Sequence, residues 1–218
     1  IVVALGPDTH SPAVGQTVLL PVGCGTWSTH IMAVAKTLLP LPNEADPLQL
    51  AMMTVNPPTA SLMLSEFVDL EQGEWVIQNV ANSGVGTYLI QLAKVRGLKT
   101  VNVVRRESAI ASVLETGGDV VLVDGPDLAK RVKEATDGAK IRLAIDAVGG
   151  KSTEHLAMCL TQSGVLVNYG AMSGEPCQIS PASFVFRDIT LRGFWLSQWF
   201  QNASPEKRMV VFGEVAKL

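Results

Sequence analysis

A short turn at residues 82–86 carries the strongest chemical signal in the sequence. The apolar run Trp75–Val80 leads into Asn82–Gly86, which contains two glycines, and a helix-length segment follows. A glycine turn between a strand and a helix lets backbone N–H groups approach a pyrophosphate, and the helix dipole favours that anion. The complete G-x-G-x-x-G pattern is absent, so the glycines alone also fit a plain tight turn. The strand before them and the helix after them favour a dinucleotide phosphate site.

The end of the next strand bears on which dinucleotide would bind. An NAD site usually has an acid there, about 20 residues after the glycines, which binds the ribose 2′-OH. Here the run Thr100–Val104 ends in Arg105 and Arg106, and two guanidinium groups suit a 2′-phosphate. Glu107 follows directly and is an alternative partner for a ribose, while an arginine pair is also common on a solvated surface. The pattern favours NADPH over NADH.

Three further segments lie where open α/β sheets bind ligands. Small residues follow apolar runs at Asp146–Gly150 and at Asn168–Met172, and both belong to the carboxyl edge of the predicted sheet. Ordinary turn chemistry explains these small residues equally well when they are taken alone. The last run ends in Arg192–Trp199, whose aromatic residues are more typical of a domain interface than of a cofactor wall.

Metal ligation and disulfide bonding find no support in the sequence. Cys24, Cys159 and Cys177 lie far apart and form no C-x-x-C pair, and the histidines are isolated. These spacings match neither a structural zinc site nor a disulfide framework. We therefore expect a zinc-free protein in a reducing compartment.

The elements that position these residues follow from the hydrophobic pattern. From Pro47 onward, short apolar runs alternate with helix-length segments, which is typical of βαβ units and a parallel sheet. The sequence therefore predicts an α/β fold with a doubly wound sheet. We expect its strands near Trp75–Val80, Thr100–Val104, Val120–Val123, Leu143–Val148, Val165–Tyr169 and Ile189–Phe194.

The helices carry ordinary start and stop signals. Gly97 and Gly117 each end a predicted helix, because glycine readily adopts the left-handed conformation at a helix end. Asp127 is expected to cap the helix that ends near Thr136. One further helix, Pro47–Leu64, precedes the first strand of the sheet.

In residues 1 to about 48, short apolar runs are separated by turn residues, which is typical of β-strands. Ile1–Gly6 begins as a strand, and Thr17–Val22 forms the next apolar run. Prolines crowd the stretch Pro40–Pro47, which marks a domain boundary. The predicted domains are therefore a partial β-rich domain over residues 1–47 and a dinucleotide-binding domain over residues 48–218.

The composition limits the classes of partner. Of the 218 residues, 47% are hydrophobic and 17% are charged, and the formal net charge is -3. No basic block is available to neutralise a phosphate backbone, so nucleic acid is not an expected partner. No apolar run reaches the roughly 18 residues of a membrane span, so no membrane partner is expected. A soluble, core-rich protein is predicted.

These motifs together resemble the medium-chain dehydrogenase/reductase superfamily, and within it the zinc-free mitochondrial-type 2-enoyl thioester reductases. The resemblance runs through essentially the whole chain, and its most distinctive parts are Asn82–Gly86 and Arg192–Trp199. Val55–Ala60, Asn102–Arg105 and Val148–Ser152 are similar to the same family. The resemblance implies a Rossmann NADPH-binding domain joined to an incomplete GroES-like catalytic domain.

The resemblance also implies an activity. Members of the family transfer a hydride from NADPH to the β-carbon of a trans-2-enoyl thioester, carried by CoA or by acyl carrier protein, in fatty acid synthesis. The proton-donating tyrosine of the family would precede Ile1, so no catalytic residue is expected in this chain. The family implies a homodimer, located in the mitochondrion of a eukaryote and otherwise in the cytoplasm. The residues implied in cofactor binding are Asn56, Asn82, Ser83, Gly84, Val85, Arg105, Arg106, Tyr169, Gly170, Ala171, Met172, Phe194, Trp195 and Leu196.

Two alternatives to thioester reduction stay open at this point. A quinone reductase of the same superfamily would use the same NADPH-binding domain. A non-catalytic NADPH-binding protein, of the kind that the superfamily also provides as lens crystallins, would bind the cofactor without turnover. A tyrosine in the position that the family uses for protonation would distinguish the thioester reductase from both.

Overall fold

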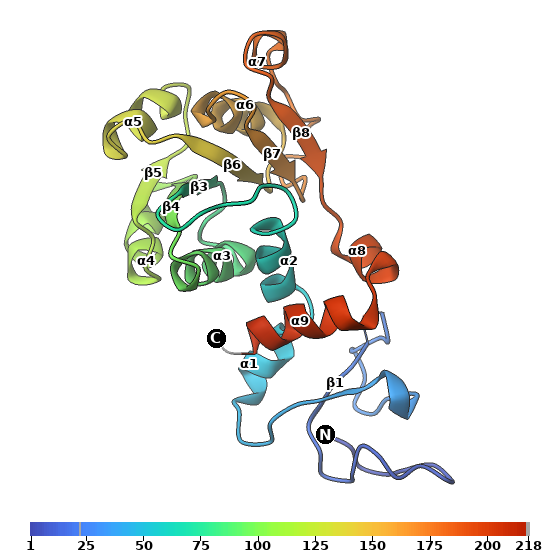
Figure 1. Ribbon diagram of the computed structural model, residues 1–218. Helices are drawn as coiled ribbons and strands as arrows, with labels where there is room; N and C mark the ends of the chain where they lie inside the picture. The colour runs from blue at the N-terminus through green and yellow to red at the C-terminus, as the bar shows by residue number, and fades with distance from the viewer. Residues whose placement is uncertain (22, 217–218) are drawn as a thin grey trace.

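The computed structural model describes residues 1–21 and 23–216, which form a helix-flanked sheet and a smaller N-terminal part (Figure 1). The sheet has six strands in the order β5-β4-β3-β6-β7-β8, and all neighbouring pairs are parallel. Each predicted strand is present, with its ends shifted by no more than two residues. The strands are β3 (Trp75–Gln78), β4 (Lys99–Val104), β5 (Val120–Val123), β6 (Ile141–Asp146), β7 (Val165–Asn168) and β8 (Thr190–Gly193).

The strand order creates a switch point in the middle of the sheet. β3 pairs with β4 on one side and with β6 on the other. The connection after β5 therefore carries the chain across the sheet, and the loops after β3 and β6 leave in opposite directions. A crevice at the carboxyl ends of these two strands is the usual ligand site of such a fold. The doubly wound Rossmann arrangement predicted from the sequence is confirmed.

Helices cover both faces of the sheet (Figure 1), and an apolar layer lies on each face. On one face, Val76 of β3 packs with Met63 and Leu89 from α2 (Asn56–Met63) and α3 (Gly84–Val95). On the other face, Ile77 packs with residues of α5 (Leu128–Ala135) and α6 (Gly150–Cys159). Successive residues of a strand point to opposite faces, so the uninterrupted apolar run of β3 serves both layers. The helix α4 (Ile110–Glu115) covers the outer part of the first face, preceded by the 3-10 turn η2 (Glu107–Ala109).

The helix ends follow the predicted glycines, and one predicted cap is wrong. Gly97 and Gly117 have φ of +70° and +102°, the left-handed conformation expected of glycine at a helix end. Asp127 occupies the N-cap position of α5, but its side chain makes no capping hydrogen bond. With φ -96° and ψ 8°, its backbone lacks the extended geometry that directs a side chain toward the first turn. The Asp127 carboxylate instead pairs with Arg131 at 3.0 Å.

The single helix predicted over Pro47–Leu64 is also wrong. The structure has two helices there, α1 (Pro47–Met52) and α2, with a break at residues 53–55. Pro57 and Pro58 have no backbone N–H, and each ring would clash with the preceding turn of a continuous helix. A new helix must therefore begin just before them. Both prolines are tolerated because they lie in the first turn of α2.

The N-terminal part contains fewer strand residues than predicted. β1 (Val18–Leu19) and β2 (Leu39–Pro40) form a two-stranded antiparallel sheet, and η1 (Ala35–Thr37) precedes β2. Within the predicted strand Thr17–Val22 only β1 is regular, and Val22 lies outside the described residues. The strand predicted over Ile1–Gly6 is absent. Val2 makes two backbone hydrogen bonds of 2.9 Å, to Gln16 and Gly15, and this single contact is too short to form a ladder.

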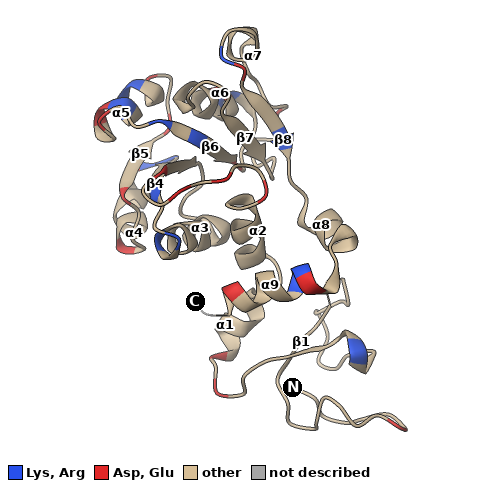
Figure 2. Cartoon of the chain, in the orientation of Figure 1, with Lys and Arg blue, Asp and Glu red and all other residues tan. Residues whose placement is uncertain are grey.

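The C-terminal helices join the two parts of the molecule. The chain continues through α7 (Pro181–Val185) and α8 (Leu196–Asn202) to α9 (Pro205–Val215). Val215 of α9 packs with Leu19, Leu41 and Met53, which belong to the region of β1, β2 and α1. The N-terminal part carries few charged residues (Figure 2). Among the described residues, every helix is too short or too polar to cross a bilayer.

Candidate functional site

A cavity of about 470 Å³ opens at the carboxyl edge of the sheet, beside the switch point. Its walls come from the ends of neighbouring strands: Asn79 and Asn82 follow β3, Arg105 and Arg106 follow β4, and Asp124 follows β5. The loops after β6 and β7 and the first turn of α6 close its other side. The topology therefore brings together residues that are far apart in the sequence.

The turn that follows β3 is built for close approach. Ser83 caps α3 by accepting a hydrogen bond of 3.1 Å from the backbone N–H of Gly86. A Cβ atom on Gly86 would lie 2.5 Å from the carbonyl oxygen of Ala81, so only glycine fits there. A Cβ atom on Gly84 would lie 2.5 Å from Nδ2 of Asn56, so α2 brings the Asn56 amide directly against the turn.

The residue that starts this turn has a strained backbone. Val80 has φ of +50°, in the left-handed region that β-branched residues rarely adopt. Hydrogen bonds on both sides hold it there: Asn79 N–H donates to the Ile145 carbonyl at 3.1 Å, and Ala81 N–H to the Val103 carbonyl at 3.2 Å. The turn is therefore fixed to both neighbouring strands before any ligand arrives.

Arg105 and Arg106 both line the cavity. Arg105 and Arg106 are exposed, and within the described ranges 1–21 and 23–216 neither lies within 4.0 Å of a carboxylate oxygen. No carboxylate among the residues that the structure describes therefore neutralises their charge. Glu107, the acid that follows them in sequence, begins η2 and does not line the cavity. An anionic ligand is the group that this wall suits.

A buried polar network fixes the strand ends behind the cavity. The Asp146 carboxylate is fully buried and accepts hydrogen bonds from Asn79 Nδ2 at 2.6 Å and Thr153 Oγ1 at 2.7 Å. The backbone N–H of Val148 donates to the same carboxylate at 2.9 Å. These bonds tie the end of β3 to the loop and helix after β6. The charge of Asp146 is satisfied internally, so its role is to position the walls.

Other predicted residues from the loop after β7 contribute unequally. Met172 lines the cavity. A Cβ atom on Gly170 would lie 2.8 Å from the Ala147 carbonyl oxygen, so this loop also packs closely against β6. Tyr169 is half-buried beside the apolar layer of α2 and α3, and burial raises its pKa to about 12, against the opposing effect of a hydrogen bond with Ser83. Ala171 is exposed and does not line the cavity.

The aromatic segment predicted to contact the cofactor lies apart from this cavity. Phe194 packs edge-on against Phe67 at 6.0 Å between ring centroids, Trp195 is 66% exposed, and Leu196 begins α8. None of the three lines the cavity. The structure thus gathers Asn82, Arg105, Arg106 and Met172 in one cavity. Ser83 and the first residues of α3, Gly84 and Val85, lie in the adjoining turn, and Asn56 of α2 packs against it. The roles of all these residues stay predictions.

Sequence reasoning missed three polar residues of the cavity wall. Asn79, Asp124 and Ser152 line it and are joined by hydrogen bonds. Asp124 comes directly after the predicted strand Val120–Val123, which was an available signal, whereas Asn79 lies within the predicted strand Trp75–Val80 and follows β3 only because that strand ends at Gln78. Nothing in the sequence pattern, however, shows which strands are neighbours in the sheet.

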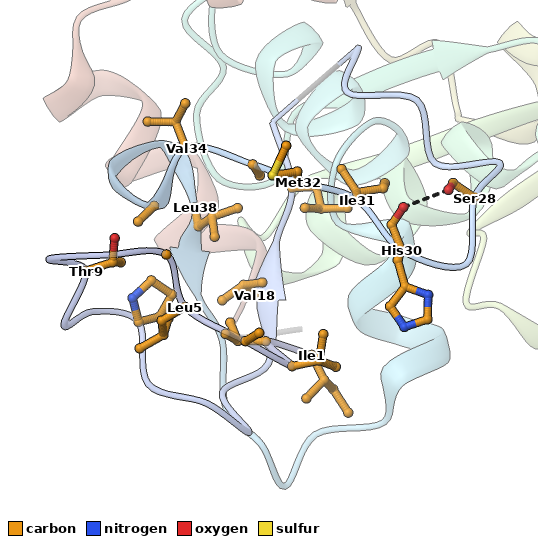
Figure 3. Close-up of a pocket in the computed structure, with 18 of the residues that line it drawn as sticks. Ile1, Leu5, Thr9, Val18, Ser28, His30, Ile31, Met32, Val34 and Leu38 are labelled. Atoms are coloured by element: carbon orange, nitrogen blue, oxygen red, sulfur yellow. Dashed lines mark hydrogen bonds between the residues drawn. The ribbon is translucent and has the colours of Figure 1, made fainter.

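A second, larger cavity of about 970 Å³ lies in the N-terminal part. Its walls are mainly apolar, with side chains such as Leu5, Ile31 and Met32 around it (Figure 3). The polar contact drawn there joins two wall residues, because Ser28 Oγ donates to the His30 carbonyl at 2.8 Å. Most of its lining residues are apolar, and His30 is the lining residue whose side chain could act as an acid or a base.

Metal ligands are not gathered anywhere in the part of the chain that the structure describes. No group of three or more His, Cys, Asp or Glu side chains there could hold an ion. Cys24, Cys159 and Cys177 are free, and burial raises the pKa of the Cys159 thiol to about 12. These residues do not fit a zinc ion.

Comparison with known proteins places the chain in a family. The family model described as zinc-binding dehydrogenase matches residues 84–210. A mitochondrial enoyl-acyl-carrier-protein reductase of Caenorhabditis elegans is 38% identical over 99% of this chain and 63% of its own length. The human protein of that name is 37% identical over 94% of this chain and 57% of its own length. The chain therefore spans less than two thirds of these relatives.

Solved structures agree with this placement. The mitochondrial 2-enoyl thioester reductase Etr1p/Etr2p heterodimer from Candida tropicalis superposes with a TM-score of 0.89 at 30% identity, over 98% of this chain and 65% of that one. The complex of Etr1p with NADP and crotonyl-CoA gives 0.91 at 29% identity, with the same coverage. A putative NADPH:quinone reductase from Bacillus thuringiensis gives 0.88 at 27% identity, over 100% of this chain and 66% of that one. The chain belongs to the zinc-binding dehydrogenase family, as its sequence resemblance to the medium-chain dehydrogenase/reductase superfamily predicts.

Proposed function

We propose that this chain supplies the NADPH-binding part of a trans-2-enoyl thioester reductase. One observation carries the proposal: Arg105 and Arg106, which form no ion pair with any residue that the structure describes, line a cavity that adjoins a glycine turn at the switch point of the sheet. That combination supports separate sites for a pyrophosphate and for a 2′-phosphate. Relatives named as enoyl-acyl-carrier-protein reductases add the substrate class.

The residues fit NADPH in a specific way. The first N–H groups of α3, at Gly84 and Val85, have no partner within the helix and would hold the pyrophosphate. Arg105 and Arg106 would hold the 2′-phosphate, and Asn82 and Met172 would contact the bound nucleotide from the cavity wall. Ser83 keeps the first turn of α3 in place through its capping bond. The bound cofactor supplies a hydride from C4 of its nicotinamide.

The division of labour between the two parts of the chain is also proposed. Residues 48–218 form the Rossmann domain that binds and orients NADPH, and residues 1–47 belong to a GroES-like catalytic domain. The mainly apolar cavity of the N-terminal part suits an acyl chain, because its walls offer few groups that need hydration. The roles of Tyr169, Gly170 and Ala171, and of Phe194, Trp195 and Leu196, are proposed on the nicotinamide side.

The assembly that we propose is a homodimer. β8 is an edge strand of the sheet, and all four of its residues are exposed. Its outer backbone groups face no strand in the described part of the chain, and such an edge readily pairs with another strand. The Candida neighbour is a heterodimer by name. A mitochondrial location, in a eukaryotic source, is proposed from the names of the relatives.

The activity is tested with the full-length protein that contains this chain, by following NADPH absorbance with crotonyl-CoA and separately with a quinone. The proposal expects oxidation of NADPH with the thioester and little with the quinone. The neighbour named as a putative NADPH:quinone reductase supports quinone reduction as the second candidate. Turnover of the quinone alone would establish that candidate. Tight NADPH binding without either turnover would show a non-catalytic NADPH-binding protein.

A further inference from the structure

We propose that Asp124 is a specificity-determining residue of the nucleotide cavity, whose negative charge opposes a 2′-phosphate and limits the preference for NADPH over NADH. The inference rests on the proposed NADPH site. It concerns an acid that no glycine or arginine motif points to. The expected acid of an NAD site follows β4, whereas this one follows β5.

The sheet places Asp124 beside the arginine pair. β4 and β5 are parallel neighbours, and Val104 lies opposite Val123 in their register. The next residues along the two strands are therefore Arg105 and Asp124, which leave the sheet side by side. The backbone N–H of Asp124 donates to the Val104 carbonyl at 2.9 Å, which continues the ladder to this point. Both side chains line the same cavity.

Hydrogen bonds hold the Asp124 carboxylate at the cavity wall. Ser152 Oγ donates to Oδ2 at 2.7 Å, and His155 Nδ1 lies 2.8 Å from Oδ1. Ser152 Oγ also accepts from Asn79 Nδ2 at 3.1 Å, and Asn79 is bonded to the buried Asp146. The carboxylate is thus fixed to α6 and to the end of β3. A freely rotating surface acid would turn toward solvent, but this one cannot.

No guanidinium group neutralises Asp124 in the described structure. Within 4.0 Å of its carboxylate, the basic side chain present among residues 1–21 and 23–216 is His155. Arg131, on the helix that follows β5, pairs with Asp127 at 3.0 Å and donates to the Val123 carbonyl at 2.8 Å. Arg105 and Arg106 therefore attract the phosphate of a 2′-phosphorylated ribose, and Asp124 repels it from the same cavity.

The arginine pair and the Asp124 carboxylate should favour different nucleotides. Binding of a 2′-phosphate is strengthened by the positive charges of the arginines and weakened by the negative charge of the Asp124 carboxylate. A plain ribose 2′-OH can donate a hydrogen bond to the carboxylate and gains little from the arginines. Removing the charge of Asp124 should therefore raise the affinity for NADPH and leave the affinity for NADH unchanged or lower. Because the cavity is open to solvent, we expect a change in the affinity ratio of roughly three- to tenfold.

The test is a fluorescence titration of NADPH and NADH on the intact protein and on Asp124→Asn, with 2′,5′-ADP and 5′-AMP as probes that differ only in the 2′-phosphate. Asp124→Ser is a second neutral replacement in case the amide disturbs Ser152 or His155, and circular dichroism shows that each variant is folded. Glu107→Gln removes the same charge near Arg106 but outside the cavity, so it is the matched control.

The proposal expects both neutral variants to raise the ratio of NADPH to NADH affinity, and of 2′,5′-ADP to 5′-AMP affinity, while Glu107→Gln leaves it nearly unchanged. An unchanged or lower ratio in folded Asp124 variants of a protein that binds NADPH overturns this inference and leaves the proposed function standing. An equal rise in Glu107→Gln also overturns it, since net charge alone would then explain the effect. Failure of the intact protein to bind NADPH overturns both proposals.

Discussion

Gly86 lies so close to Ala81 that an added Cβ atom would stand 2.5 Å from the Ala81 carbonyl oxygen. The first turn of α3 therefore packs directly on the backbone that leaves β3. Gly84, two residues earlier, meets only the amide end of the Asn56 side chain at the same distance. A side chain amide can rotate away from a new methyl group, whereas a backbone carbonyl held in a turn cannot.

We expect Gly86→Ala to lower the free energy of unfolding by about 1 to 3 kcal/mol, because the added methyl group must displace backbone. Gly84→Ala should cost less than about 1 kcal/mol, since Asn56 can move. Urea unfolding of the two variants measures the difference. A larger loss for Gly84→Ala than for Gly86→Ala would contradict the packing described for this turn.

The arginine pair makes a prediction about cofactor choice. Arg105→Ala removes a charge-assisted contact that we propose to a 2′-phosphate, so NADPH affinity should fall by about 1.5 to 3 kcal/mol, or roughly ten- to a hundredfold. NADH affinity should change little. Calorimetric titration of both nucleotides against the parent and the variant measures these affinities. An equal loss of affinity for NADPH and NADH would show that Arg105 does not bind the 2′-phosphate.

A bidentate ion pair adds to the apolar contacts that hold the C-terminal helix α9 in place. Arg96 Nε and Nη2 donate to the two carboxylate oxygens of Glu214 at 2.9 and 2.8 Å, and Nη2 also donates to the buried Ser61 at 2.9 Å. Because the pair is bidentate, partly buried and anchored on a third residue, Arg96→Ala should lower the free energy of unfolding by about 1 to 2 kcal/mol.

A control for this effect is an exposed ion pair of the same chain. Lys130 and Glu134 on α5 stand 3.9 Å apart with side chains 79% and 63% exposed. Lys130→Ala should change the free energy of unfolding by less than about 0.5 kcal/mol. Equal losses from Arg96→Ala and Lys130→Ala in urea would show that the pair at α9 contributes no more than a surface pair.

Acid sensitivity should arise in part from Glu74. Hydrogen bonding from Arg142, with Nε to Oε1 at 2.9 Å, holds the pKa of the Glu74 carboxyl below its usual value. The unfolded chain then binds the proton more readily than the folded one, so this stabilisation is present above the unfolded pKa of about 4.3 and is lost as the pH falls through the folded pKa.

Glu74→Gln should therefore lose less stability than the parent between about pH 6 and pH 3, as measured by the urea midpoint at each pH. Glu134→Gln on the exposed face of α5 is the matched control and should behave as the parent does. An identical pH dependence in Glu74→Gln and the parent would show that the contact with Arg142 does not stabilise the folded state.

The sheet was predictable because its signals are local. Each strand is an apolar run bounded by turn residues, and Gly97 and Gly117 end helices by a conformation that glycine adopts readily. The break before Pro57 was also visible in the sequence, since neither that residue nor Pro58 can continue a helix from the preceding turn. The prediction of one helix over Pro47–Leu64 overlooked this signal.

Other features depend on contacts that sequence patterns do not contain. The run Ile1–Gly6 has the composition of a strand, but a strand forms only where a partner supplies a ladder, and Val2 alone finds one. Asp124 becomes a cavity residue because β5 lies beside β4, which sets it next to Arg105. Strand neighbours are a property of the whole sheet, so neither outcome could be derived from local spacing.

We propose that the glycine turn and the arginine pair bind different phosphate groups of one NADPH molecule, and a crystal structure with NADPH would show this. Density for the pyrophosphate is expected at the start of α3, over Gly84 and Val85. The 2′-phosphate is expected within hydrogen-bond distance of Arg105 or Arg106. Density for the nucleotide elsewhere, or a 2′-phosphate turned away from both arginines, would contradict the proposal.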